Sequence, residues 1–366
     1  MDATRIAESL FAMQARSLLV IGDVMLDRYI DGRVTRMSPE APVPVLEKSA
    51  ESDMPGGAAN VACNLAALGC DVRLLAVTGD DAAGDRLASL LGSNLAIDFA
   101  RICDPDRPTT RKTRFRSDGQ QVLRVDEELT ASVSDDVQAR LLDSVKSQLA
   151  TVNAVILSDY AKGGLPVSLM QQIIAAANDA GIPVIADPKQ SDFGSYAGAS
   201  LLTPNLAELR AATGLVDDDL EAIANATSTL AATHSIDAIL ATLSARGMLL
   251  SDAAGDWQHA PAEAREVFDV SGAGDTVVAM LAACVAAGIA HQDALPLANL
   301  AAGVVVGKSG TAVASPGEII SAGMPGAIST SWADAADACE TWRKSGQSVG
   351  FTLSLIHISE PTRPQC

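Results

Sequence analysis

The sequence predicts an α/β fold with a mostly parallel central sheet and helices on both faces. Short apolar runs that favour buried strands alternate along the chain with Ala-rich segments of helical period. Because strands that alternate with helices form parallel sheets covered on both faces, this order predicts a three-layer sandwich. The strand candidates are 17–24, 72–77, 154–157, 183–186, 201–203 and 238–242, and the helix candidates are 58–68, 81–91, 167–180 and 220–233.

Charge and composition exclude several classes of partner. The chain has 366 residues, with 26 Lys plus Arg against 45 Asp plus Glu, and its net charge is −19. An acidic chain repels the phosphates of nucleic acids and the surface of an anionic membrane, so we expect neither as a partner. Binding of a small phosphate remains open, because it depends on local loops and helix ends.

Cysteine spacing and hydropathy favour a cytoplasmic protein. None of the six cysteines has the CxxC spacing of a zinc or redox site, and a reducing compartment is therefore expected. The N-terminus shows no signal-peptide pattern. The longest apolar stretch follows Asp275 and ends near Ile289, short of the roughly 20 residues of a membrane span.

Two stretches interrupt the alternation of strands and helices, at about 28–48 and 109–126. The first holds short β-like pieces, and the second predicts a hairpin that turns at 117–119. Both are too polar for the central sheet. They predict a small separate sheet that acts as a lid over the site or as a dimer surface. Two surface excursions without a function are the alternative.

The motif with the sharpest chemical meaning is DVSGAGD at 269–275, followed at once by an apolar helix. Gly272, Ala273 and Gly274 precede the predicted helix, whose free N–H groups and positive dipole end form an anion hole. A carboxylate at that place suits a general base that takes a proton from a hydroxyl during phosphoryl transfer. Asp275 is the candidate, and simple helix capping is the alternative.

Two motifs near the N-terminus suggest a site for hydroxyl groups. Gly56 and Gly57 permit an unusual turn, and Asn60 offers a donor and an acceptor. Asp23 and Asp27 follow the first strand, and their carboxylates could hold sugar hydroxyls. Ordinary loop glycines and one capping aspartate with one solvated aspartate are the alternatives.

Polar groups after two later strands suggest contacts with a nucleotide or a phosphate. Asn205 and Glu208 could share one helix face and orient a hydrated Mg²⁺, although a capping box explains the same pair. Lys162 and Lys189 each lie just beyond a strand end, where they could bind phosphate or remain solvated. The P-loop-like run at 303–309 is one residue short and is interpreted as a helix end.

These motifs, in this order, resemble the PfkB/ribokinase family of carbohydrate kinases. The run at 56–60 looks like the first family signature and 269–275 like the second. Within the family the chain is most similar to kinases of heptose 7-phosphate, at 22–45, 109–115, 158–163, 186–189 and 202–208. The resemblance spans about residues 15–323. It implies a ribokinase-like three-layer sandwich with a small β lid.

The resemblance also implies a role for each matching residue. Asp275 would be the catalytic base, and Gly272, Ala273 and Gly274 the anion hole. Glu208 would hold Mg²⁺ through water, and Asp269 a monovalent cation such as K⁺. The sugar-phosphate ligands would be Asp23, Asp27, Gly56, Gly57, Asn60, Arg111, Lys162 and Lys189, and the ATP ligands Asn205, Leu206, Ala207, Glu208, Ser244, Gly247 and Asn299.

The activity implied by the resemblance is ATP-dependent phosphorylation of D-glycero-β-D-manno-heptose 7-phosphate at O1. This step would serve the synthesis of ADP-heptose for the lipopolysaccharide core. A kinase for another sugar or sugar phosphate, and a non-catalytic sensor on the same fold, remain as alternatives. The resemblance further implies a homodimer formed through the lid.

The C-terminal part departs from the kinase pattern. Residues 1–323 are predicted to form the kinase domain, and 324–352 resemble a linker with the first strand of a nucleotidyltransferase domain. The last segment, 353–366, has neither a helix nor a strand pattern and is interpreted as a non-native tail. We therefore expect no nucleotidyltransferase activity from this chain.

Overall fold

The computed structural model describes residues 1–217, 219–262 and 268–324. The chain divides into two compact units, Met1–Gly323 and Met324–Cys366, and the helices and strands of the described residues all belong to the first. The expectations for the segment 324–352, apart from Met324, and for 353–366 lie outside the described residues. In the described part of the chain, no helix is long and apolar enough to cross a membrane.

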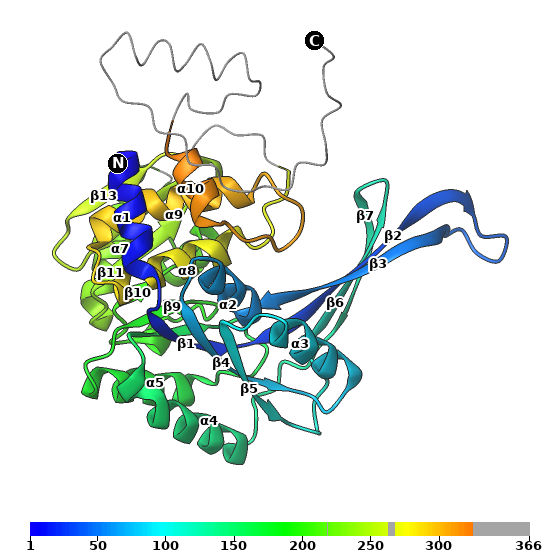
Figure 1. Cartoon of the computed structure of the whole chain (residues 1–366), viewed down its shortest axis with the longest axis horizontal. Helices are drawn as coiled ribbons and strands as arrows, with labels where there is room; N and C mark the ends of the chain where they lie inside the picture. Colours follow the sequence, from blue (N-terminus) through cyan, green and yellow to red (C-terminus); the bar gives the residue numbers. More distant parts are fainter. Residues whose placement is uncertain (218, 263–267, 325–366) are drawn as a thin grey trace, which may run out of the picture. The chain divides into compact units, whose positions relative to one another are not determined.

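A nine-stranded sheet forms the centre of the first unit (Figure 1). Its strands follow the order β13-β12-β11-β10-β9-β8-β1-β4-β5, and they are parallel except that β12 runs against both of its neighbours. The mostly parallel sheet is therefore confirmed. The strands are β1 (Ser17–Gly22), β4 (Asp71–Thr78), β5 (Ile97–Cys103), β8 (Ala154–Ser158), β9 (Val184–Asp187), β10 (Leu201–Leu202), β11 (Ala238–Thr242), β12 (Met248–Asp252) and β13 (Trp257–Ala260).

Helices cover both faces of this sheet and give the predicted three layers. The strand β1 shows how: Leu18 and Val20 pack into one apolar core, while Leu19 and Ile21 pack into the other. The first core lies under α1 (Ala3–Met13), α2 (Ala58–Ala67), α3 (Ala82–Gly92), α8 (Ala273–Ala286), α9 (His291–Val305) and α10 (Pro316–Ala322). The second lies under α4 (Asp135–Gln148), α5 (Val167–Asp179), α6 (Leu206–Thr213) and α7 (Leu220–His234).

A second, four-stranded sheet extends away from the central one as a long arm (Figure 1). We call it the lid sheet. Its order is β3-β2-β6-β7, from β2 (Val24–Met37), β3 (Pro44–Gly57), β6 (Arg111–Ser117) and β7 (Gln120–Glu127). The predicted hairpin between β6 and β7 is present. The first predicted segment was too short, because β2 and β3 pair continuously from Val24 to Gly57 apart from two bulges.

The shortest connection between the two sheets is a single residue. Asp23 separates the last residue of β1 from the first residue of β2. Its backbone N–H donates to the Ser158 carbonyl, and its carbonyl accepts from Ala58 N–H. From β1 the sheet grows through β4 on one side and through β8 on the other, so the strand order changes direction at β1. Open α/β sheets bind ligands at such switch points. The lid sheet therefore begins at the place where a ligand is expected.

Candidate active site

The DVSGAGD motif at 269–275 forms the loop before α8 and the first turn of that helix. Gly272 is the N-cap, with φ of +77°, and Asp275 lies in the first turn. The helix was expected to begin after Asp275, but it begins at Ala273. Gly272 occupies the capping position, so Asp275 is not the N-cap. Its carboxylate is free to serve another role although the residue is only 6% exposed.

Both carboxylate oxygens of Asp275 accept a hydrogen bond. Asn60 Nδ2 donates to Oδ2 at 2.6 Å, and the Tyr160 hydroxyl donates to Oδ1. Burial raises the pKa of Asp275 to about 6; the two hydrogen bonds oppose this shift and the carboxylate of Asp27 adds to it. A general base works best when its pKa lies near the working pH. Asp275 therefore has the electrostatic setting of a base near neutral pH.

A chain of amides fixes the direction of Asn60, which lies in the first turn of α2. Asn64 Nδ2 donates to the carbonyl of Asn60 at 3.0 Å and to its Oδ1 at 3.3 Å. The Thr276 hydroxyl in turn donates to Asn64 Oδ1 at 2.9 Å. A Cβ at Gly272 would lie 2.7 Å from Asn60 Nδ2, so the motif needs glycine there. Sequence reasoning missed Asn64 and Thr276; Asn64 lies one helical turn beyond the Asn60 that it named.

The lid sheet brings Asp27 beside the same carboxylate. Asp27 is buried in β2, where its Oδ1 accepts from Arg114 of β6. A Cβ at Gly56 would collide with Asp27 Oδ2, and Gly57, with φ of +60°, is the N-cap of α2. Gly56 thus leaves room for Asp27, and Gly57 leaves room for the Asp23 carbonyl next to the start of α2. The residues predicted to hold hydroxyl groups thus come from the lid sheet and the first turn of α2.

Asp23 has a different role from the expected one. Its buried carboxylate accepts three backbone N–H bonds, from Tyr160 at 3.0 Å, Lys162 at 2.9 Å and Gly164 at 3.0 Å. Burial raises the pKa of Asp23, and these N–H groups oppose the shift. A carboxylate engaged in this way holds a turn together. We therefore correct the expectation that Asp23 holds the sugar.

The residues expected on the nucleotide side form the N-terminus of α6. Asn205 is the N-cap, Leu206 and Ala207 follow it, and Glu208 completes a capping box with two bonds of 2.9 Å. The capping box, one alternative from the sequence, is therefore present. Lys189 Nζ also binds Glu208 Oε1 at 2.8 Å. Burial raises the pKa of the neighbouring Asp187 well above its usual value, helped by Asp275 and Glu208.

Three further nucleotide candidates converge on one loop. Ser244 opens a short 3-10 helix (Ser244–Arg246), and Gly247 follows it with φ of +88°. A Cβ at Gly247 would lie 2.7 Å from the carbonyl carbon of Pro261, whose oxygen accepts from Asn299 Nδ2 at 2.9 Å. Asn205 is bridged to Thr242 just before this segment. The structure thus places Asn205, Ser244, Gly247 and Asn299 on connected segments.

Each cation that the sequence singled out has a carboxylate partner. Arg111 pairs with Glu127 across the lid sheet, Lys162 with Glu128 at 2.8 Å, and Lys189 with Glu208 at 2.8 Å. Sequence reasoning missed Arg114 and Arg116, which follow the Arg111 it named along β6. Their guanidinium carbons lie 5.4 and 4.5 Å from the centre of the Tyr29 ring. Both arginines line a pocket between the lid sheet and the loop before α8.

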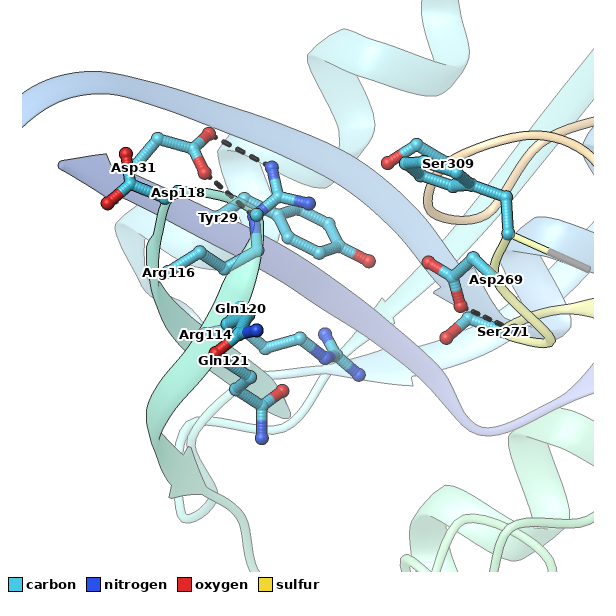
Figure 2. A pocket seen from close by; sticks show the side chains of 12 residues that line it. Tyr29, Asp31, Arg114, Arg116, Asp118, Gln120, Gln121, Asp269, Ser271 and Ser309 are labelled. Atoms are coloured by element: carbon cyan, nitrogen blue, oxygen red, sulfur yellow. Dashed lines mark hydrogen bonds and ion pairs between the residues drawn. The ribbon is translucent and has the colours of Figure 1, made fainter. Parts of the chain in front are cut away.

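The pocket lies between the lid sheet and the loop before α8 and has a volume of about 680 Å³. Figure 2 shows Tyr29, Arg114 and Arg116 on one side of it and Asp269, Ser271 and Ser309 on the other. Asp269 accepts N–H bonds from Ser271 at 2.9 Å and Gly310 at 3.0 Å. Among the described residues, no group of three or more His, Cys, Asp or Glu side chains could hold a metal ion.

The fold and the site together define a class of enzyme. A buried aspartate in the first turn of a helix, at the switch point of an α/β sheet and beside a β lid, is the arrangement of a phosphotransferase that acts on a small hydroxyl-bearing acceptor. The model of the pfkB family of carbohydrate kinases matches residues 15–317, and the chain belongs to this family. It is a sugar kinase, a phosphotransferase with an alcohol acceptor.

Curated relatives extend the match beyond the kinase motifs. The bifunctional protein HldE of Paramagnetospirillum magneticum is 43% identical over 366 residues, which cover 98% of this chain and 75% of the relative. HldE of Rhodospirillum rubrum is also 43% identical, over 99% of this chain and 74% of the relative. HldE of Geobacter sulfurreducens is 45% identical over 86% of this chain and 64% of the relative.

Solved structures share the fold. Arabidopsis thaliana ribokinase complexed with ribose and ATP superposes with a TM-score of 0.67 at 24% identity, over 86% of this chain and all of that one. Escherichia coli phosphofructokinase-2 in complex with fructose-6-phosphate gives 0.70 at 18% identity, over 85% of this chain and 98% of that one. The predicted ribokinase-like fold is confirmed.

Proposed function

We propose that this sugar kinase transfers the γ-phosphoryl group of ATP to O1 of D-glycero-β-D-manno-heptose 7-phosphate and so produces the 1,7-bisphosphate. The observation that carries the proposal is the buried Asp275, which accepts a hydrogen bond from Asn60 and feels the charge of Asp27, in a chain 43% identical to HldE proteins over nearly its whole length. The match to heptose kinase motifs at 22–45, 109–115 and 202–208 supports this acceptor. Its product would serve ADP-heptose synthesis.

The chemistry follows from the setting of Asp275. Its carboxylate takes the proton of the O1 hydroxyl while O1 forms a bond to phosphorus and the bond from phosphorus to ADP breaks. The N–H groups of the N-cap Gly272 and of Ala273 and Gly274 in the first turn would face the negative charge on the transferred group, because they have no acceptors within the helix. The N–H of Ala273 would have to leave the Val270 carbonyl, which accepts it at 3.3 Å. The lid sheet restricts access of water, which would otherwise compete as acceptor.

Two sets of residues hold the substrates in this proposal. Asp27, Gly56, Gly57 and Asn60 hold the sugar, and Arg111, Lys162 and Lys189 are candidates for its phosphate. ATP is held by Asn205, Leu206, Ala207, Glu208, Ser244, Gly247 and Asn299. Glu208, whose carboxylate oxygens accept from Asn205 N–H and Lys189 Nζ, and the neighbouring Asp187 would hold Mg²⁺ through its waters, and the ion when bound would neutralise phosphate charge. We also propose that Asp269 helps to seat a K⁺ ion.

The remaining sequence predictions stay proposals. We propose that residues 1–323 form the kinase domain, with a linker and the start of a nucleotidyltransferase at 324–352 and a non-native tail at 353–366. A homodimer through the lid sheet is supported by the exposed Val122, Leu123 and Val125 on β7. The cytoplasmic location is likewise a prediction.

The decisive test is Asp275→Asn. This change keeps the shape of the side chain and removes the base, so we expect kcat to fall about 10³-fold while the affinity for ATP stays within a factor of about three. ADP release measured with Mg²⁺, ATP and a panel of sugar phosphates gives kcat, and calorimetry gives the affinity. Near-normal turnover in the variant would sink the mechanism. A faster reaction with another sugar would show that this sugar, and not heptose 7-phosphate, is the acceptor. If the parent protein binds ATP and the sugar phosphate without turnover, it is a sensor.

A further inference from the structure

One group that touches Asp275 is not used in the proposed reaction. Tyr160 follows β8, and its hydroxyl donates to Asp275 Oδ1. The same turn carries Lys162 and belongs to the run at 158–163, in which the sequence suggested only a lysine for phosphate. The question is what a tyrosine contributes when it is placed directly on the base.

The turn that carries Tyr160 is held from both sides. Asp23 accepts the backbone N–H groups of Tyr160, Lys162 and Gly164 at 2.9–3.0 Å. Asp159 Oδ1 accepts the N–H of Ala161 at 2.7 Å, and Ala161 has the left-handed φ of +53°. Such a conformation persists only where the surroundings enforce it. Three bonds to one buried carboxylate therefore fix where the Tyr160 ring begins.

The hydroxyl of Tyr160 leaves room for a substrate on the base. Each carboxylate oxygen has two lone-pair sites. Tyr160 uses one site on Oδ1 and Asn60 uses one on Oδ2, so both oxygens keep a site for the proton of an acceptor hydroxyl. Two donors from different segments, α2 and the turn after β8, set the plane of the carboxylate.

The charges that face Asp275 explain why two donors are needed. The carboxylate of Asp27 approaches from β2 and disfavours a negative charge at Asp275. The charge of Asp275 in turn helps to raise the pKa of Asp187 at the end of β9. Burial, followed by the charge of Asp275, raises the pKa of Tyr160 well above its usual value, so the phenol keeps its proton and remains a donor. A neutral donor favours the ionised carboxylate without adding charge to the phosphoryl site.

We propose that Tyr160 is a positioning residue for the phosphoryl transfer, holding the Asp275 carboxylate ionised and aligned through its hydroxyl, and that Asp23 acts through the turn 159–164 to keep Tyr160 in place. This inference rests on the proposed role of Asp275 as the base. In this proposal Asp23, the first carboxylate of the motif at 22–27, supports the turn that carries Tyr160 and does not bind the sugar.

The test is Tyr160→Phe, which removes only the hydroxyl. A donor lost from a carboxylate raises its pKa, so the acidic limb of the kcat–pH profile should move to higher pH by about one unit. Turnover should then fall about fivefold at pH 6 and much less at pH 8, with the KM for ATP unchanged. A merely structural loss would lower the whole profile without moving its limb.

Tyr196→Phe is the matched control. Tyr196 is buried, and its hydroxyl also donates to an aspartate, Asp159 Oδ2, at 2.6 Å. It does not contact Asp275 and reaches the turn only indirectly, because Asp159 also accepts the Ala161 N–H, so its loss should move the acidic limb much less than Tyr160→Phe does. Asp23→Asn should shift the limb in the same direction as Tyr160→Phe, because the turn loosens. A limb that stays within about 0.2 units of the parent in Tyr160→Phe, or that moves equally in Tyr196→Phe, overturns the inference.

A titration without substrate separates this inference from the proposed function. Carbon-13 signals of aspartate carboxyls in the parent, Tyr160→Phe and Asp275→Asn proteins identify the Asp275 signal and its pKa directly. We expect this pKa to rise in Tyr160→Phe. If the pKa of Asp275 rises in Tyr160→Phe while Asp275→Asn keeps its turnover, Asp275 is not the base, although Tyr160 does act on its carboxylate. If it stays unchanged while Asp275→Asn is inactive, Tyr160 has no such role.

Discussion

The central sheet and the lid sheet are stabilised in different ways. Every residue of β8 is buried, and β1 is buried except at Ser17, whereas all eight residues of β7 are exposed. The central strands gain their stability from apolar surface on two faces. The lid strands are linked instead by ion pairs across the sheet, such as Arg28 with Asp53 at 2.8 Å. The site therefore joins a rigid support to a polar, more easily deformed cover.

Burial also changes along the lid sheet itself. Near the central sheet, Arg114 and Asp27 are only 18% and 5% exposed. Further out, Arg116 and Asp31 are 23% and 34% exposed, and their bond is 2.7 Å long. Both arginines lie over the ring of Tyr29. The base of the lid therefore has the character of a core, and its outer part that of a surface.

The largest expected effect comes from the central sheet. Leu19 in β1 is fully buried, so Leu19→Ala should lower the free energy of unfolding by about 3 kcal/mol, from lost burial and the cavity that remains. Leu123 in β7 is 54% exposed, and Leu123→Ala should change it by less than about 0.5 kcal/mol. Urea unfolding of both variants makes the measurement. Equal losses would contradict the difference between the two sheets.

The next effect probes the gradient of burial in the lid. Arg114→Ala leaves the buried Asp27 without its partner and should cost about 2 kcal/mol, whereas Arg116→Ala should cost about 0.5 kcal/mol, since Asp31 keeps contact with water. The same urea experiment applies, with Arg114→Lys as a variant that keeps the charge. The idea of a core-like base fails if Arg116→Ala is the more damaging change.

The smallest effect concerns the link between the lid and the turn that carries Tyr160. The hydrogen bond from Lys162 lowers the pKa of Glu128, burial opposes this shift, and Lys112 lowers the pKa further. The net result is a lowered pKa. A carboxyl with a lowered pKa stabilises the fold above its unfolded pKa, near 4.5, and loses that contribution as the pH falls through the folded value.

Glu128→Gln should therefore cost about 0.5–1 kcal/mol at pH 7 and almost nothing at pH 3. Thermal unfolding of the parent and the variant at both pH values makes the comparison. A difference that is constant across this range would show that Glu128 acts through packing rather than through its charge.

Most of the central sheet could be predicted because its strands are apolar and short. Six strand candidates fall within two residues of observed strands, and β11 matches its predicted range at both ends. The sequence pattern missed β5, β12 and β13, which lie toward the two edges of the sheet. The strand β13 is exposed or half-buried along its length, so it lacks the continuous apolar run that identifies a buried strand.

The residues of the candidate site also differ in how well the sequence could predict them. Asp275, Gly272 and Asn60 could be named because each stands in a local motif, and the structure brings them into contact. Tyr160 and Thr276 could not, since their importance comes from partners far along the chain. Asp23 was placed correctly at a strand end, but a sequence cannot show whether a carboxylate faces a ligand or backbone N–H groups.

The contacts around the base also set an order of assembly. Asn60 and Tyr160 reach Asp275 across 215 and 115 positions of sequence, and Asp23 reaches the turn across 137 to 141. Closing such long loops costs entropy before any contact forms, and contacts of this kind arise late in folding. A chain still leaving the ribosome can complete much of its sheet before α8 emerges. The catalytic centre is thus among the last parts of the molecule to exist, and no early fragment carries it.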